Sequence, residues 1–145
     1  MSILRIVLAS VGAFAAYFAF GGAVFVLLPS LKTEFQKHPG IYRDHEGQMS
    51  HMPAAMVGIL LAVVALAVLY AWGCPQPLEM GSRALSGLIF GVLIGVFVVG
   101  AFVLHNFANL QIGAKLAAQQ AIAYFAEWVI VGLLIGLIYR PVAQP

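Results

Sequence analysis

Glu127 is the residue of this 145-residue chain whose surroundings most demand a chemical explanation. It lies deep inside an otherwise charge-free apolar stretch, and the next charged residue along the chain is Arg140. A carboxylate in hydrocarbon is costly, so the group must be protonated, paired or open to water. Two interpretations follow: a structural hydrogen bond that fixes helix register, or an acid in a proton, ion or ligand site.

Other polar side chains collect near the turn that precedes Glu127 in the sequence. His105, Asn106 and Asn109 end the third apolar stretch, and the two asparagines would continue one face of that helix. The fourth stretch returns with Tyr124 and Glu127, which are three positions apart and therefore share a face. We expect these five residues to form one site for a proton, an ion or a small ligand.

A histidine and methionine segment is the second candidate site. Its possible ligands are His38, His45, Met49, His51 and Met52. Imidazole and thioether groups together suit copper, although the spacing matches no closed metal-site motif. The alternative interpretation is a hydrated loop at the membrane surface. Haem held between His51 and His105 is conceivable chemically, but one histidine in each segment is a poor basis for it, and no cofactor is predicted.

The sequence also excludes several classes of function. It has no G-x-S-x-G motif, no phosphate-binding glycine loop and no pair of carboxylates, which favours a protein that is not an enzyme. Its seven Lys and Arg residues are scattered and the net charge is +2, so no nucleic-acid partner is expected. The one cysteine, Cys74, cannot form an intramolecular disulfide bond.

The elements that would position these side chains are transmembrane helices. With 63% hydrophobic and 8% charged residues and a mean hydropathy of +1.01, the chain is far too apolar for a water-soluble fold. Four apolar stretches each reach the roughly 20 residues that a spanning helix needs. They cover 6–28, 54–72, 84–107 and 117–139, with a long loop over 29–53. We expect a single transmembrane domain, an all-α four-helix bundle.

The first stretch and its continuation need separate comment. Arg5 before an apolar run resembles a signal peptide, but the run exceeds the about 7 to 15 residues of a cleavable segment. We therefore expect an uncleaved first span. Beyond it, Leu28, Leu31 and Phe35 fall at helical spacing. This spacing predicts that the first helix continues into the membrane interface. Pro39 would end that helix.

Glycines recur at four-residue intervals in the last two stretches. They are Gly87, Gly91 and Gly95 in the third and Gly132 and Gly136 in the fourth. Small residues at this spacing let two helices approach closely, and we expect them to pack within the chain. Homo-oligomerisation and a glycine-lined pore are the alternatives. Glu127 points about 140° to 180° away from the glycines of its own helix, so it must face a different neighbour.

Charge gives little guidance on orientation. Arg5, Arg83 and Arg140 fall on the side of the termini, and Lys32, Lys37, Arg43 and Lys115 fall on the other. Aromatic residues at helix ends on the terminal side, Tyr70, Trp72 and Tyr139, resemble an interfacial belt. We expect the termini to be cytoplasmic.

The whole pattern resembles a loose group of small bacterial inner-membrane proteins with four predicted spans. The resemblance is carried by Gly21 and Gly22, Leu27 and Leu28, Tyr42 and Arg43, Tyr70, the GLIFG that opens the third span and the terminal GLLIGLIYRP. It implies a four-span topology and a bacterial plasma-membrane location. It implies no catalytic activity, because the group has none that is established.

Three functional hypotheses remain open at this point. The first is a noncatalytic accessory or assembly component of a membrane complex, with membrane lipid and other membrane-protein helices as its partners. The second is a small transporter or channel for a proton, ion or small ligand that uses the cluster around Glu127. The third is a metal-handling membrane protein that uses the histidine and methionine segment.

Overall fold

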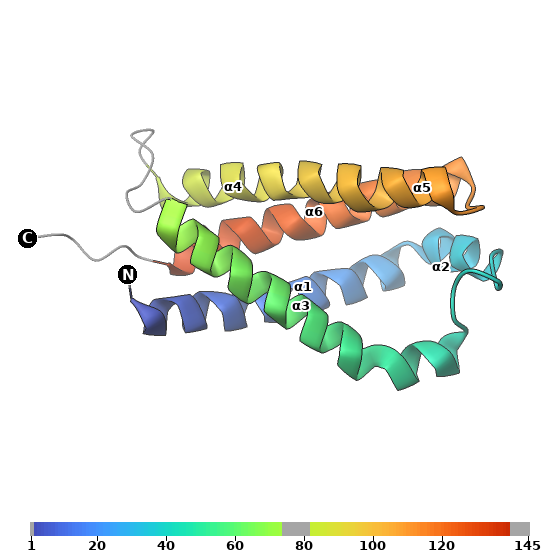
Figure 1. Cartoon of the computed structure of the whole chain (residues 1–145), viewed down its shortest axis with the longest axis horizontal. Helices are drawn as coiled ribbons and strands as arrows, with labels where there is room; N and C mark the ends of the chain where they lie inside the picture. Colours follow the sequence, from blue (N-terminus) through green and yellow to red (C-terminus); the bar gives the residue numbers. More distant parts are fainter. Residues whose placement is uncertain (1, 74–81, 140–145) are drawn as a thin grey trace, which may run out of the picture.

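The computed structural model describes residues 2–73 and 82–139, which form helices joined by short connections (Figure 1). Cys74 and Arg140 lie outside the described residues. The helices are α1 (Ile3–Leu27), α2 (Pro29–Gln36), α3 (His45–Gly73), α4 (Arg83–Val98), the π-helix η1 (Val99–Leu104), α5 (His105–Asn109) and α6 (Ala114–Ile138).

Four of the helical segments are long and apolar enough to cross a membrane. They are Ile3–Leu27, His45–Gly73, Arg83–Asn109 and Ala114–Ile138, the third of which combines α4, η1 and α5. Even the 25-residue helices would extend about 38 Å, which exceeds the hydrocarbon core of a bilayer. The predicted all-α four-helix bundle is confirmed, and we treat the chain as a multi-pass membrane protein.

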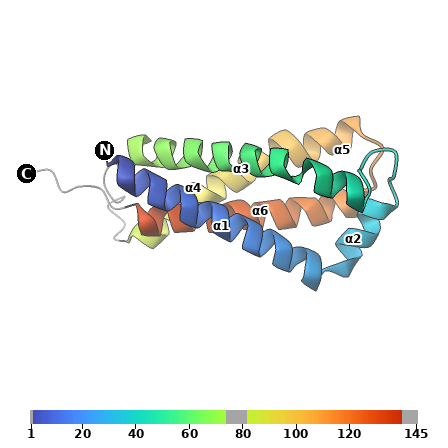
Figure 2. The same ribbon diagram turned by 90° about the horizontal axis from the view of Figure 1, so that it is seen from below.

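The helices pack unequally around α6. Helices α4 and α6 run antiparallel and side by side (Figure 1), and α1 packs along another face of α6 (Figure 2). Helix α3 crosses α1 obliquely and diverges from the bundle toward its own N-terminal end (Figure 1). The beginning of α1 and the end of α6 share one end of the molecule, whereas α2, α5 and the start of α3 share the other (Figure 1).

Glycines set the close contact between α4 and α6. A Cβ atom placed on Gly91 would lie 2.7 Å from the backbone oxygen of Val129, and one on Gly136 would lie 2.8 Å from that of Arg83. Gly87 likewise faces the backbone of Gly132. Because a side chain at these positions would meet backbone atoms, only glycine permits this approach, and the van der Waals contacts it allows hold helices together in lipid.

Two clusters of buried side chains support the bundle. The larger joins α1, α3 and α6, and its members are Ile6, Ala9, Ala13, Val63, Ala67, Tyr70, Ala71, Trp128, Val131, Ile135 and Tyr139. The smaller lies at the other end, where Leu31 of α2 packs against Val103, Ile112, Leu116 and Ala117. The smaller cluster fixes α2 against η1 and the start of α6.

The segment over 29–53, expected as a loop, is largely helical. Pro29 begins a separate helix, α2, because a residue before proline avoids the helical region, and Leu28 adopts φ −118° and ψ 71°. The third helix begins at His45 and contains Pro53. The side chain of Asp44 accepts a hydrogen bond of 2.8 Å from the backbone N–H of Gly47, which caps the new helix start.

Candidate functional site

The carboxyl of Glu127 lies near the middle of α6 and faces α1. The residue is 5% exposed, and its Oε1 atom lies directly against Gly21. A hydrogen bond joins the carboxyl to the hydroxyl of Tyr17, one helical turn before Gly21 on α1. The second oxygen, Oε2, is buried and has no hydrogen-bond partner among the residues that the structure describes. The carboxyl therefore sits between two helices and is only partly satisfied.

Aromatic residues lie around this carboxyl in sequence and in space. The rings of Tyr17 and Trp128 lie 5.4 Å apart, and Trp128 follows Glu127 directly in α6. Tyr124, half-buried, lies one turn earlier on the same helix. In such apolar surroundings a carboxyl and two phenols can hold a proton and share hydrogen bonds. Within residues 2–73 and 82–139, no ion pair to Glu127 is present, so the group has no charged partner there.

Glu127 and the glycines of α6 face different helices. Gly132 and Gly136 contact α4, whereas Glu127 contacts α1. A Cβ on Gly95 would lie 2.8 Å from the ring of Phe125, which fills the space above the glycine contact. Helix α6 therefore uses one side for close packing and another for its single intramembrane acid.

The structure does not bring His105, Asn106 and Asn109 together with Glu127. All three are exposed, and the side-chain amide of Asn109 donates to the backbone oxygen of His105 at 2.8 Å. The glycine contacts place Gly91 opposite Val129, so position 93 lies opposite Glu127. His105 is twelve positions beyond that level, an axial separation of about 18 Å. Of the predicted cluster, Tyr124 alone stays beside Glu127.

The error came from where the turn was placed. A turn centred on Gly113 puts Glu127 only about 9 Å deeper in the bundle than His105. In the structure α5 ends at Asn109 and α6 begins at Ala114, so the turn is centred nearer position 111. A turn centre closer to His105 places His105 nearer to the turn and Glu127 further from it, so the axial distance between the two residues increases. The two side chains are too far apart for a direct contact or a single bridging water.

The histidine and methionine segment forms no compact ligand set. His45, Met49, His51 and Met52 lie on α3, where all four are exposed, and His38 follows α2. Nδ1 of His51 lies 2.9 Å from the backbone oxygen of Gly47. No group of three or more His, Cys, Asp or Glu side chains in the described parts of the chain could hold a metal ion. The metal hypothesis gains no support from this geometry.

The histidine pair considered for haem is also separated by the fold. His51 lies near the start of α3 and His105 opens α5. These two helices make no extensive contact among the described residues. Axial ligation of one iron needs two imidazoles that face each other across the ring, and this arrangement does not provide them.

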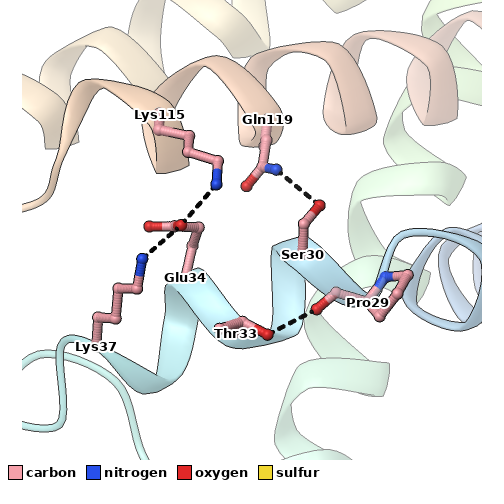
Figure 3. A network of polar contacts seen from close by, with 7 residues as sticks. All are labelled: Pro29, Ser30, Thr33, Glu34, Lys37, Lys115 and Gln119. Carbon is pink, nitrogen blue, oxygen red and sulfur yellow. Dashed lines mark hydrogen bonds and ion pairs between the residues drawn. The ribbon is translucent and has the colours of Figure 1, made fainter.

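A polar cluster that the sequence reasoning missed fixes α2 to α6 (Figure 3). The carboxylate of Glu34 accepts hydrogen bonds from Lys37 at 2.8 Å and from Lys115 at 2.9 Å. Beside it, the amide of Gln119 donates to the hydroxyl of Ser30 at 3.0 Å. The hydrogen bonds from Lys37 and Lys115 lower the pKa of Glu34 below its ordinary value. This cluster anchors the interfacial helix to the bundle.

The N-terminal half of α3 carries a second feature that the sequence reasoning missed. Every residue from 48 to 58 is exposed, and a Cβ atom placed on Gly58 would meet nothing within 4 Å. Ala54 and Gly58 have the same four-residue spacing as the glycines between α4 and α6. That spacing was the available signal in the sequence, but the prediction considered pairs of glycines and omitted this pair of an alanine and a glycine.

No protein-family model, curated protein or solved structure matches this chain. The resemblance to small four-span bacterial inner-membrane proteins therefore remains a prediction from the sequence. The geometry of the described residues has to carry the functional argument.

Proposed function

We propose that this chain is a noncatalytic accessory or assembly component of a larger membrane complex, and that α3 provides the surface that binds a neighbouring transmembrane helix. The observation that carries the proposal is the exposed N-terminal half of α3. There, Met56, Val57, Leu60 and Leu61 are between 40% and 65% exposed.

Comparison within the chain supports this use of α3. The small residues of α4 and α6 are covered by one another, so their close-packing faces are already occupied. Ala54 and Gly58 form a similar face that no helix covers in the described residues. Leu61 lies one turn further on the same side and would flank an approaching helix. Lipid also covers exposed apolar helices, and the experiment must separate a protein neighbour from lipid.

Site-specific photocrosslinking in the native membrane tests the proposal. A photoreactive amino acid at Leu61 should give a discrete crosslinked product that contains a different membrane protein. The matched control is Leu93 on α4, which is similarly exposed at 63% and has the large residues Ile89, Val96 and Phe97 around it on the same side. If Leu61 crosslinks only to lipid, or gives the same products as Leu93, the accessory role through α3 is wrong.

The proposed location is the plasma membrane of a bacterium, with both termini in the cytoplasm. The positive charges are divided nearly evenly between the two ends, so the aromatic residues at helix ends are the main support for this orientation. Reporter fusions at residue 2 and within the segment 37–44 measure it directly. The reporter that is active only in the cytoplasm should work at the N-terminus and fail in that segment.

A second function is favoured by one specific observation, the buried and unpartnered Oε2 atom of Glu127. An intramembrane acid with spare hydrogen-bonding capacity suits a proton-binding site in a small transporter or channel. In proteoliposomes that contain the purified protein, this function predicts a proton flux that Glu127→Gln abolishes while the fold is retained. Equal fluxes for the wild type and the variant would leave Glu127 with a structural role.

A further inference from the structure

The end of the bundle that carries α2 contains a groove, separate from Glu127, that has the features of a ligand site. Its volume is about 880 Å³, within the range of small-molecule pockets. The end of α1, helix α2, the connection over 37–44 and the first turn of α3 form its walls. These elements meet at the end of the apolar span, where the structure changes from lipid-facing to polar side chains.

Charge distinguishes this groove from the surrounding surface. Four Lys and Arg side chains lie at this end of the molecule, and two of them, Lys37 and Lys115, are paired with Glu34. The other two, Lys32 and Arg43, both line the groove. Neither makes an ion pair among the residues that the structure describes. The groove therefore holds both of the cations at this end that make no ion pair among the described residues.

The one carboxylate in the groove is already engaged. Asp44 caps α3 through its hydrogen bond of 2.8 Å from the backbone N–H of Gly47. The side chain of Gln48 donates to the backbone oxygen of Arg43 at 2.8 Å, which holds the connection against α3. With two cations against one capping carboxylate, the groove is complementary to an anion.

The aromatic part of the groove lining is preformed. The rings of Phe25 and Phe35 stack at 5.9 Å, and Phe35 meets Tyr42 edge to face at 4.6 Å. The hydroxyl of Tyr42 accepts a hydrogen bond of 3.2 Å from Gln120 of α6. These contacts link α1, α2, the connection and α6, so the wall needs no ligand to assemble. Phe25 and Val26 extend it toward the apolar span.

We propose that this groove binds an acidic phospholipid of the surrounding membrane. Lys32 and Arg43 bind the phosphate of its headgroup, and Phe25 and Val26 contact the upper part of an acyl chain. An amphiphile fits better than a soluble anion because the groove joins uncompensated cations to an apolar wall at the end of the span. This inference is independent of the helix-binding role of α3, since it rests on different residues.

Lipid titration of the full-length protein in detergent, followed by native mass spectrometry, tests the proposal. Phosphatidylglycerol should bind about tenfold more tightly than phosphatidylcholine. A Lys or Arg near a membrane surface contributes about 1 kcal/mol to binding an acidic lipid, and tenfold corresponds to one or two such residues. Lys32→Gln combined with Arg43→Gln should remove this preference. The matched control is Lys37→Gln, which also removes a cation from this end but lies outside the groove, and it should change binding by less than about twofold.

Two further outcomes decide the source of the anion and the location of the site. Inorganic phosphate or glycerol 3-phosphate in millimolar excess should fail to displace phosphatidylglycerol, and full displacement would overturn a lipid as the ligand. A phosphatidylglycerol with a photoreactive acyl chain should label the peptide that contains Phe25 and Val26 in the unmodified protein. This measurement needs no variant to fold, and labelling spread evenly over the lipid-facing helices would overturn the proposal.

Discussion

The carboxyl of Glu127 on α6 lies so close to Gly21 on α1 that a Cβ atom at position 21 would stand 2.6 Å from Oε1. The glycine makes room for the acid, and the acid fills the space that the glycine leaves. Tyr17, one turn away, supplies the hydrogen bond that orients the carboxyl. Contact between α1 and α6 therefore depends on a small residue and a polar residue that match each other.

Gly21→Ala should destabilise the protein by about 1 kcal/mol, because the new methyl group forces the buried carboxyl to move. Thermal unfolding in detergent measures the change. Gly22→Ala is the control, since a Cβ atom there meets nothing within 4 Å. In a background that carries Glu127→Ala, the cost of Gly21→Ala should disappear. A cost that persists in that background would mean that Gly21 is constrained by something other than Glu127.

Gly91→Ala should be more damaging than Gly21→Ala. The added methyl group would lie 2.7 Å from the backbone oxygen of Val129 and 2.9 Å from its Cα, and backbone atoms cannot rotate away as a carboxyl can. Separation of α4 from α6 should cost about 2 to 3 kcal/mol. The same unfolding measurement gives the order of the two variants. If Gly21→Ala proved the more harmful, the close approach of α4 and α6 would not limit stability.

The sequence was sufficient for the fold class, the four spans and the direction of Glu127 relative to the glycines of α6, since helical periodicity determines all three. It was insufficient for the partner of Glu127. Tyr17 and Gly21 lie four positions apart on one face of α1, but which face of α1 meets α6 depends on tertiary packing. The level of His105 was misjudged because a small error in placing the turn displaces facing residues in opposite directions along the bundle.

Glu34, at the end of the molecule that carries α2, should make the stability of the protein depend on pH. Hydrogen bonds from Lys37 and Lys115 lower its pKa in the folded state below the ordinary value of 4.5. Its contribution is therefore present above about pH 4.5 and is lost as the pH falls through the folded-state pKa. Melting temperatures of the wild type and Glu34→Gln should differ at pH 7 and converge at low pH.

The partners of Glu34 provide the check on this interpretation. Lys115→Gln removes the donor that connects α2 to α6 while Lys37 remains bonded, so the pH-dependent difference in melting temperature should shrink without vanishing. A difference that stays constant from pH 7 to pH 3 in the comparison of wild type with Glu34→Gln would contradict the lowered pKa.

Tyr17→Phe should have a smaller effect than Gly91→Ala. It removes the hydroxyl that bonds Glu127 and leaves the aromatic contact with Trp128 in place. Hydrogen bonds between membrane helices average about 0.6 kcal/mol and reach about 1.7 kcal/mol, so the substitution should lower the unfolding free energy by an amount within that range. A double-mutant cycle with Glu127→Gln isolates the pairwise term. Strict additivity of the two substitutions would show that the hydroxyl and the carboxyl do not interact.

Gly58→Leu separates the binding surface of α3 from the stability of the chain. A Cβ atom at position 58 meets no atom within 4 Å. The unfolding free energy of the isolated protein should therefore change by less than about 0.5 kcal/mol. A helix that packs against Ala54 and Gly58 would be pushed away by the leucine, and the crosslinked product from Leu61 should be lost. The matched control is Gly22→Leu on α1, an equally open glycine. If Gly58→Leu leaves the product intact, the neighbour does not pack on this face; if both variants abolish it, the loss is not specific to α3.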